Sequence, residues 1–182
     1  LPKLKRLRSL NLAETRITDI GVEHLKKCFA LEYLAIGTKG VHGRTLAALS
    51  QLPALQTLAL DGSVVNDDAM QNLSGFVALW HLSLMNTRVS DSGIQSLMKT
   101  SPQIRSLNLN GLNLGSEAMR AIAKANTLES LGIINVPVSE AGLLALAPAT
   151  NLKTIFYFNN RFDGRSVQKF IKLRPDVKII GG

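Results

Sequence analysis

The chain has 182 residues, enough for one domain or two small ones, and 46% of them are hydrophobic although only 5% are aromatic. Its 21 basic and 13 acidic residues leave a net charge of +8, which favours solubility and would also suit an anionic partner. No run of about 18 apolar residues is present, which excludes a membrane-spanning helix. Cys28 is the only cysteine, which excludes an intrachain disulfide.

Leucine-type residues recur along the whole chain at a nearly constant spacing, and only one interval differs from the others, by a single residue. The equivalent positions that begin the successive units are Leu7, Leu31, Leu55, Leu79, Ile104, Leu128 and Leu152. Apolar residues fall three and five positions after each of them, which gives an LxxLxLxx pattern. Its last part alternates with a period of two, so each unit is predicted to begin with a short strand.

The second half of each unit predicts a short helix. Two apolar residues lie three positions apart, which places them on one face of a helix. A column of small residues comes just before this pair: Gly21, Thr45, Ala69, Gly93, Ala118, Gly142 and Ser166. Residues that favour a helix N-cap precede it in five units: Thr18, Asn66, Ser90, Ser139 and Asp163. Each unit is therefore predicted to contain, in order, a strand, a turn, a capped short helix and a second turn.

Such units bury their apolar faces only by stacking on one another, so we expect one continuous core along the array. Parallel strands lie about 4.8 Å apart and packed helices about 8–10 Å, so the stack has to curve with its strands inside. We predict an α/β fold, a right-handed solenoid over residues 1–182 as a single domain, with a parallel sheet on the concave face and short helices on the convex face. Incomplete units are expected at both ends: residues 1–6, and a final strand with Val177 and Ile179 facing the core. The glycines of "GTKGVHGRTL" predict a looser turn around residues 37–43.

Two segments, "LRSLNLAETRITDIGVEHL" and "LWHLSLMNTRVSDSGIQSL", closely resemble bacterial leucine-rich repeats of the ribonuclease-inhibitor-like group. The resemblance centres on a T-x-[IV]-[TS]-D-x-G run, seen here from Thr15 to Gly21 and from Thr87 to Gly93. It implies a horseshoe that binds other proteins, and it implies no particular partner.

Strand alternation places the third, fifth and seventh residues of each unit on the concave face. Most are small and weakly polar, but Ile134, Phe156 and Phe158 are not. An exposed cluster of this kind is typical of a binding site. The alternative is that a following strand or a C-terminal cap covers it. Other concave or flanking residues that could contact a partner are Tyr33, Trp80, His81 and Met85.

Catalysis and metal binding are not predicted. His81 would lie beside Ser106, but no carboxylate in the third or fifth columns could orient it. Asp67 and Asp68 fit the first turn of a helix better than a metal site. We find no nucleotide-binding or zinc-protease motif, so no cofactor is expected.

The sequence therefore favours a protein- or peptide-binding module, as part of a longer bacterial protein. An alternative is a structural or regulatory array that positions a fused domain absent from this segment. A third is polyanion binding by the basic ends, although these lie far apart and nucleic acid is not expected. The basic ends are Lys3, Lys5, Arg6, Arg8, Arg161, Arg165, Lys169, Lys172, Arg174 and Lys178. Because neither end carries a polar cap, we also expect self-association through the ends.

Overall fold

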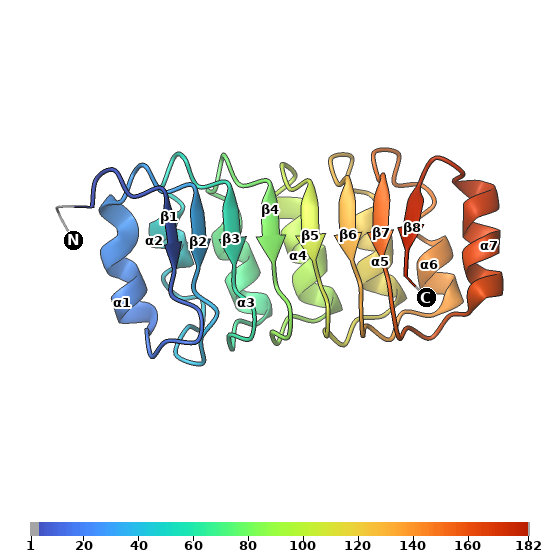
Figure 1. Cartoon of the computed structure of the whole chain (residues 1–182), viewed down its shortest axis with the longest axis horizontal. Helices are drawn as coiled ribbons and strands as arrows, with labels where there is room; N and C mark the ends of the chain where they lie inside the picture. The colour runs from blue at the N-terminus through green and yellow to red at the C-terminus, as the bar shows by residue number, and fades with distance from the viewer. Residues whose placement is uncertain (1–3, 182) are drawn as a thin grey trace.

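Eight short parallel strands form one open sheet in the order of the chain. The computed structural model describes residues 4–181, so Lys3 of the basic ends lies outside the described residues. The strands are β1 (Ser9–Asn11), β2 (Tyr33–Ala35), β3 (Thr57–Ala59), β4 (His81–Ser83), β5 (Ser106–Asn108), β6 (Ser130–Gly132), β7 (Thr154–Phe156) and β8 (Lys178–Ile180). Figure 1 shows them side by side from the N-terminal to the C-terminal end of the array. Every strand runs parallel to its neighbours, as the repeat predicted.

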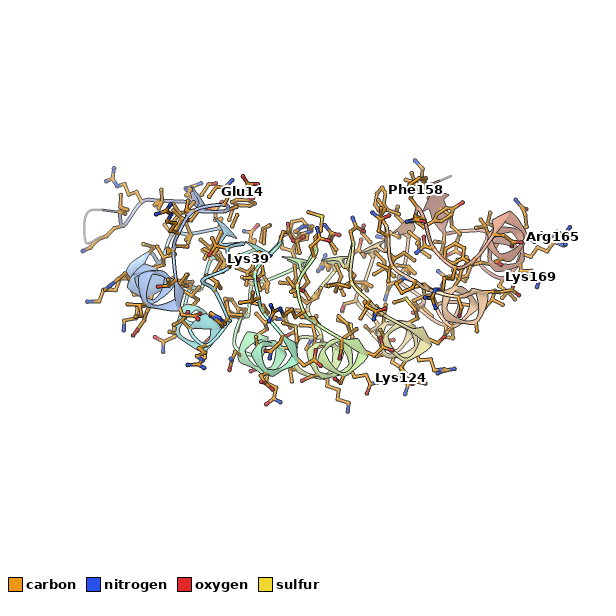
Figure 2. All side chains as sticks on the ribbon, turned by 90° about the horizontal axis from the view of Figure 1, so that it is seen from below. Glu14, Lys39, Lys124, Phe158, Arg165 and Lys169 are labelled. Carbon is orange, nitrogen blue, oxygen red and sulfur yellow. The ribbon has the colours of Figure 1, made fainter. Side chains whose placement is uncertain are left out.

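Short helices alternate with the strands and lie together on the other side of the molecule. They are α1 (Asp19–Glu23), α2 (Leu46–Leu49), α3 (Asp67–Met70), α4 (Asp91–Thr100), α5 (Ser116–Ala123), α6 (Glu140–Leu144) and α7 (Gly164–Leu173), with 3₁₀ turns η1 (His24–Lys27) and η2 (Gln71–Leu73). Figure 2 shows the array as an arc with the helices on its outer side and the strands on its inner side. The predicted fold class is confirmed. Among residues 4–181, none of the helices has the length and hydropathy that a membrane span requires.

The core is one continuous column of aliphatic side chains between sheet and helices. The central residue of each strand pairs with its counterpart in the next, for example Leu34 with Leu58 and Leu58 with Leu82. These three leucines have no exposed surface. The predicted final strand is present as β8, where Ile179 pairs with Ile155. Identical neighbours at each layer explain why the same apolar residue type recurs at the same position.

Glycines in the second repeat make close backbone contacts, so the expectation of a looser turn over residues 37–43 is wrong. A Cβ atom on Gly37 would lie 1.9 Å from the Asp61 carbonyl oxygen, and one on Gly40 would lie 2.6 Å from that of Ile17. Gly43 has φ of +88°, a left-handed conformation that favours glycine. Each glycine is therefore required by packing or by the backbone conformation.

Side-chain capping occurs at only three of the five predicted N-cap positions. Ser90, Ser139 and Asp163 accept hydrogen bonds from backbone N–H groups of their own helices. Thr18 and Asn66 precede α1 and α3 with extended backbones but make no such bond. The Asn66 amide instead donates to Asp68, at 3.4 Å.

Aspartates at the start of a helix supply a different kind of cap, directed at the next repeat. Asp19 accepts hydrogen bonds from the backbone N–H groups of His42 and Gly43 at 3.1 and 3.2 Å. Asp91 accepts one from Gly115 at 2.8 Å. These carboxylates satisfy N–H groups of the turn that precedes α2 and of the N-cap residue of α5. The Asp of the repeat motif therefore joins successive repeats as well as facing its own helix.

Asp67 makes the most extensive of these connections. Its carboxylate accepts hydrogen bonds from the Ser90 backbone N–H at 2.7 Å and from the Ser90 and Ser92 hydroxyls at 2.6 Å. Burial raises the pKa of Asp67, but the hydrogen bonds from Ser90 and Ser92 outweigh this and lower it below its usual value. The start of α3 is in this way tied to the start of α4.

The first layer is less well buried than those that follow it. Leu10 and Leu12 are half-buried, whereas their equivalents one repeat later, Leu34 and Ile36, are fully buried. Ile20 on α1 is 76% exposed. Apolar surface is therefore accessible at this end of the described chain.

Candidate binding surface

The concave face is formed by the strand side chains that point away from the core and by the turns that follow the strands. Six of these turns contain one residue in the left-handed conformation: Glu14, Gly62, Asn86, Gly111, Asn135 and Asn159. Asparagine and glycine are the residues that tolerate this conformation best. This column was not predicted, although Asn or Gly recurs at the same position in five of the seven repeats. In the six repeats with a left-handed residue, the chain turns away from the sheet at the same point, whereas Thr38 takes this place in the second repeat without positive φ.

Polar side chains on the carboxyl edge of the sheet bind backbone groups there. The Asn110 side-chain oxygen accepts a hydrogen bond from the Ile134 N–H at 2.7 Å. Asp61 accepts one from the Met85 N–H at 2.9 Å and one from the Ser83 hydroxyl at 2.5 Å. These residues fix the geometry of the face.

An apolar corner occupies the C-terminal end of this face, made of Ile134, Phe156, Phe158 and Ile180. Phe156 pairs in register with Ile180 on β8 and with Gly132 on β6. The Asn135 N–H donates to the Phe158 carbonyl oxygen at 2.8 Å, which places the turn of Ile134 beside Phe158. Figure 2 shows Phe158 at the inner, C-terminal end of the arc.

A following strand does not cover this apolar corner in the described chain. With β8 in place, Phe156 remains 39% exposed, Phe158 53% and Ile180 37%. Ile180 was missed in the sequence analysis, although it occupies the same column as Phe156, one repeat later. The corner is thus larger than predicted.

Trp80 and His81 lie elsewhere, on the amino edge of the sheet in the middle of the array. The two rings meet edge to face with centroids 5.8 Å apart, and the Trp80 indole N–H donates to Gln56 at 3.4 Å. Trp80 and Arg105 border one cavity of about 600 Å³. Arg105 itself lies 3.8 Å from the Glu129 carboxylate.

Met85 and Tyr33 belong to neither of these groups. Met85 borders a second hollow of about 900 Å³ on the carboxyl edge, where the residues at the seventh position are as small as Ala13 and Gly37. Tyr33 lies on β2, near the N-terminal end, and is 37% exposed. The seven predicted residues therefore lie in separate places: Ile134, Phe156 and Phe158 come together at one end, and Trp80 and His81 form a pair in the middle.

The His81–Ser106 pair forms as expected, with 2.8 Å between the imidazole Nδ1 and the hydroxyl oxygen. Burial lowers the pKa of His81 by more than the nearby Asp61 carboxylate raises it. His81 is therefore neutral at pH 7. Asp61 is held by Ser83 and Met85, so it does not orient the imidazole. Among residues 4–181, no cluster of three or more His, Cys, Asp or Glu side chains could hold a metal ion.

The basic ends are partly engaged in contacts of their own. The Arg174 guanidinium donates to the carbonyl oxygens of Ala147, Ala149 and Leu152, and its side chain is only 12% exposed. Arg174 was predicted as part of a basic surface, and it instead caps the carbonyl groups of the preceding turn. Lys169 hydrogen-bonds to Glu140 across repeats, and in Figure 2 it lies with Arg165 on the outer end of the arc, away from the concave face.

Residues 39–181 match the family model described as "FBD-associated F-box protein At5g56370, LRR repeats". The chain belongs to the leucine-rich-repeat family. This match confirms that the repeats are leucine-rich repeats, and the observed fold agrees with this assignment.

Solved leucine-rich-repeat structures from bacteria have a similar fold. An internalin C2 of Listeria monocytogenes superimposes with a TM-score of 0.69 and 20% identity, over 98% of this chain and 72% of that protein. An internalin of the same organism, inlF, gives 0.65 and 16%, over 97% and 54%. A leucine-rich-repeat protein of Leptospira interrogans gives 0.60 and 15%, over 98% and 50%. The chain thus spans about half the length of two of these structures. No curated protein matches it.

Proposed function

We propose that this leucine-rich-repeat chain binds a protein or peptide on its concave face, with the apolar corner as the main contact. The leucine-rich-repeat fold is commonly a protein-binding module. The observation that carries the proposal is that solvent reaches four neighbouring apolar side chains, Ile134, Phe156, Phe158 and Ile180, on an otherwise weakly polar surface. Exposed apolar patches that are continuous mark interaction sites more often than single exposed residues do.

The geometry of the corner also suits an anchor site. Aromatic side chains lose little conformational freedom on binding and bury a large area, which is why they dominate interface energies. Phe156 is fixed between two paired strands, and Ile134 is fixed by the Asn110 hydrogen bond to its N–H. A partner would therefore meet a preformed surface.

The finer family assignment belongs to the same proposal. The T-x-[IV]-[TS]-D-x-G run supports placing the chain in the ribonuclease-inhibitor-like group of bacterial leucine-rich repeats. The role of the motif aspartate in joining successive repeats gives the run a physical reason that is independent of any partner.

A displayed library of random peptides, selected on the immobilised chain, tests the function. Peptides enriched on the wild-type chain should bind the Phe156→Ser/Phe158→Ser variant more weakly by about 2 kcal/mol, roughly thirtyfold in Kd. Tyr33→Ser is the matched control, because Tyr33 is an aromatic residue of similar exposure on the same face but at the other end.

Three results would contradict the proposal. One is an absence of enriched peptides, and another is equal binding to the wild type and the double variant. A loss in Tyr33→Ser as large as in the double variant would show that the corner is not the main contact. Unfolding curves of all variants ensure that a loss of binding is not a loss of fold.

A further inference from the structure

Two irregularities of the array coincide at one place, on the amino edge of the sheet between β4 and β5. The single longer interval of the repeat separates Leu79 from Ile104, and the only tryptophan of the sequence, Trp80, lies at its start. Within this interval, α4 is followed by a turn whose Gln103 donates a hydrogen bond to the Phe76 carbonyl oxygen at 2.7 Å. The cavity of about 600 Å³ lies here, bordered by Val77, Trp80, Gln103, Arg105, Ser106 and Glu129.

The exposed apolar side chains that border this cavity are Val77 and Trp80. Val77 is 77% exposed and Trp80 43%. The indole N–H, its one polar group, is used by Gln56, and the ring is supported by His81. The exposed part of the ring is therefore carbon, held in one orientation and able to contact an apolar side chain.

The charged residues that border the cavity are Arg105 and Glu129, and Lys153 lies beside Glu129, so the surroundings carry one more cation than anion. Glu129 lies between two cations, 2.7 Å from Lys153 and 3.8 Å from Arg105. The hydrogen bond and charge of Lys153, with a smaller contribution from Arg105, lower the pKa of Glu129, which stays ionised at neutral pH. Lys153 is the closer partner, so Arg105, with 65% of its side chain exposed, keeps donors free for another anion.

We propose that this cavity is a subsite for a peptide segment in which an apolar side chain lies against Trp80 and Val77 and a neighbouring carboxylate binds Arg105. The inference rests on the proposed peptide-binding function and adds a preference for peptides in which an acidic residue neighbours an apolar one. Guanidinium groups bind carboxylates through paired N–H donors, which gives direction as well as charge. The Ser106 hydroxyl, which is paired with His81, also borders the cavity beside Arg105.

A single-stranded nucleic acid is the other ligand that a tryptophan next to an arginine can attract. Binding of such a strand requires a row of basic residues that follows the phosphate backbone away from the stacked base. Here the column that contains Trp80 continues as Gln56 and Glu32 on one side and as Arg105 and Glu129 on the other. The acidic residues interrupt any such track, so the surroundings favour a short acidic peptide.

Trp80 provides a direct readout, since no other residue gives an indole signal. The probes are three capped peptides, acetyl-Gly-Leu-Asp-Gly-amide and its Asn and Lys counterparts, titrated at low salt while the indole N–H resonance and the fluorescence are recorded. We expect a saturable change with the Asp peptide, a Kd roughly three- to tenfold lower than for the Asn peptide, and the weakest binding for the Lys peptide.

Arg105→Gln should abolish the preference for Asp over Asn while leaving the chain folded. Arg88→Gln is the matched control, because Arg88 is an exposed arginine in the turn after β4, at the opposite edge of the sheet. In the Phe156→Ser/Phe158→Ser variant the preference should persist. This separates a failure of the apolar corner from a failure of the Trp80 cavity.

The inference is overturned by no response of Trp80 to any of the peptides, or by equal Kd values for the Asp and Asn peptides. An equal loss of preference in Arg88→Gln and Arg105→Gln would also overturn it. Tighter binding of an oligothymidylate than of the Asp peptide would assign the cavity to nucleic acid instead.

Discussion

The residues between the layers and the residues on the concave face differ in how far they vary from one repeat to the next. Between the layers, leucine or isoleucine occupies the central strand position in all eight strands. On the concave face, the column that contains Phe156 also contains Asn11, Ala35, Asn108 and Gly132. Stacking fixes the first set, because each side chain has to fit an identical neighbour. The second set is free of that constraint, so its differences are where binding specificity can reside.

The largest effect is expected between the layers. Replacing Leu58 by Ala should lower the free energy of unfolding by about 2–5 kcal/mol, because Leu58 is fully buried and the chain cannot close the cavity. Chemical denaturation measures the loss, with Thr57→Ala on the concave side of the same strand as the control, expected within about 0.5 kcal/mol. A loss near zero for Leu58→Ala would contradict the core assignment.

The first layer offers a second control for the same comparison. Leu10 is the equivalent of Leu58 but is only half-buried, so Leu10→Ala should cost less. If the chain self-associates through this layer, the cost of Leu10→Ala should rise with protein concentration. A cost that is independent of concentration would argue against self-association at this end.

The next largest effect concerns the carboxylates that join the helices. Asp67→Ala should cost about 2 kcal/mol, because Ser90 and Ser92 lose their shared acceptor. Asp68→Ala, one residue later in the same helix, should cost less than about 0.5 kcal/mol, since Asp68 is exposed. Equal losses in the two variants would mean that the connection between repeats contributes nothing.

The contribution of Asp67 should also depend on pH. Its pKa is lower in the folded chain than the ordinary value of 3.8. A carboxyl group of this kind stabilises the fold above its unfolded pKa, and the contribution is lost as the pH falls through its folded value. The stability difference between wild type and Asp67→Asn, measured by denaturation, should therefore be full at pH 7 and shrink below about pH 4.

A smaller effect on stability is expected at the apolar corner. Phe156→Ser and Phe158→Ser should each lower the free energy of unfolding by about 1 kcal/mol or less, because both rings are already substantially exposed. The same substitutions should have a larger effect on binding than on folding. A destabilisation as large as that of Leu58→Ala would place these rings in the core.

The smallest effect should be a gain in stability. Glu14 adopts φ of +59°, where its side chain is strained, so Glu14→Gly should stabilise the chain by about 0.5 kcal/mol. Thr38 occupies the equivalent place in the second repeat, without positive φ, and donates to the Ile17 carbonyl oxygen at 2.8 Å. Thr38→Gly should therefore destabilise it, and thermal unfolding of both variants should show opposite signs.

The sequence by itself determined the layers, the parallel order of the strands, the curvature and the face on which Ile134, Phe156 and Phe158 lie. All of these follow from periodicity, because a nearly constant repeat length and an alternation of two fix the direction of each side chain. The same periodicity also places Ile180 in the column of Phe156.

Only the tertiary structure showed that Asp67 joins successive repeats whereas its neighbour Asp68 is exposed. It also showed that Arg174 caps carbonyl groups and that the glycines of the second repeat are closely packed. It also brought Trp80, Gln103 and Arg105 around one cavity. These contacts join residues of successive repeats through turns of differing length. Periodicity fixes the direction in which a side chain leaves the backbone, but the path of each turn decides which atom of the neighbouring repeat it meets.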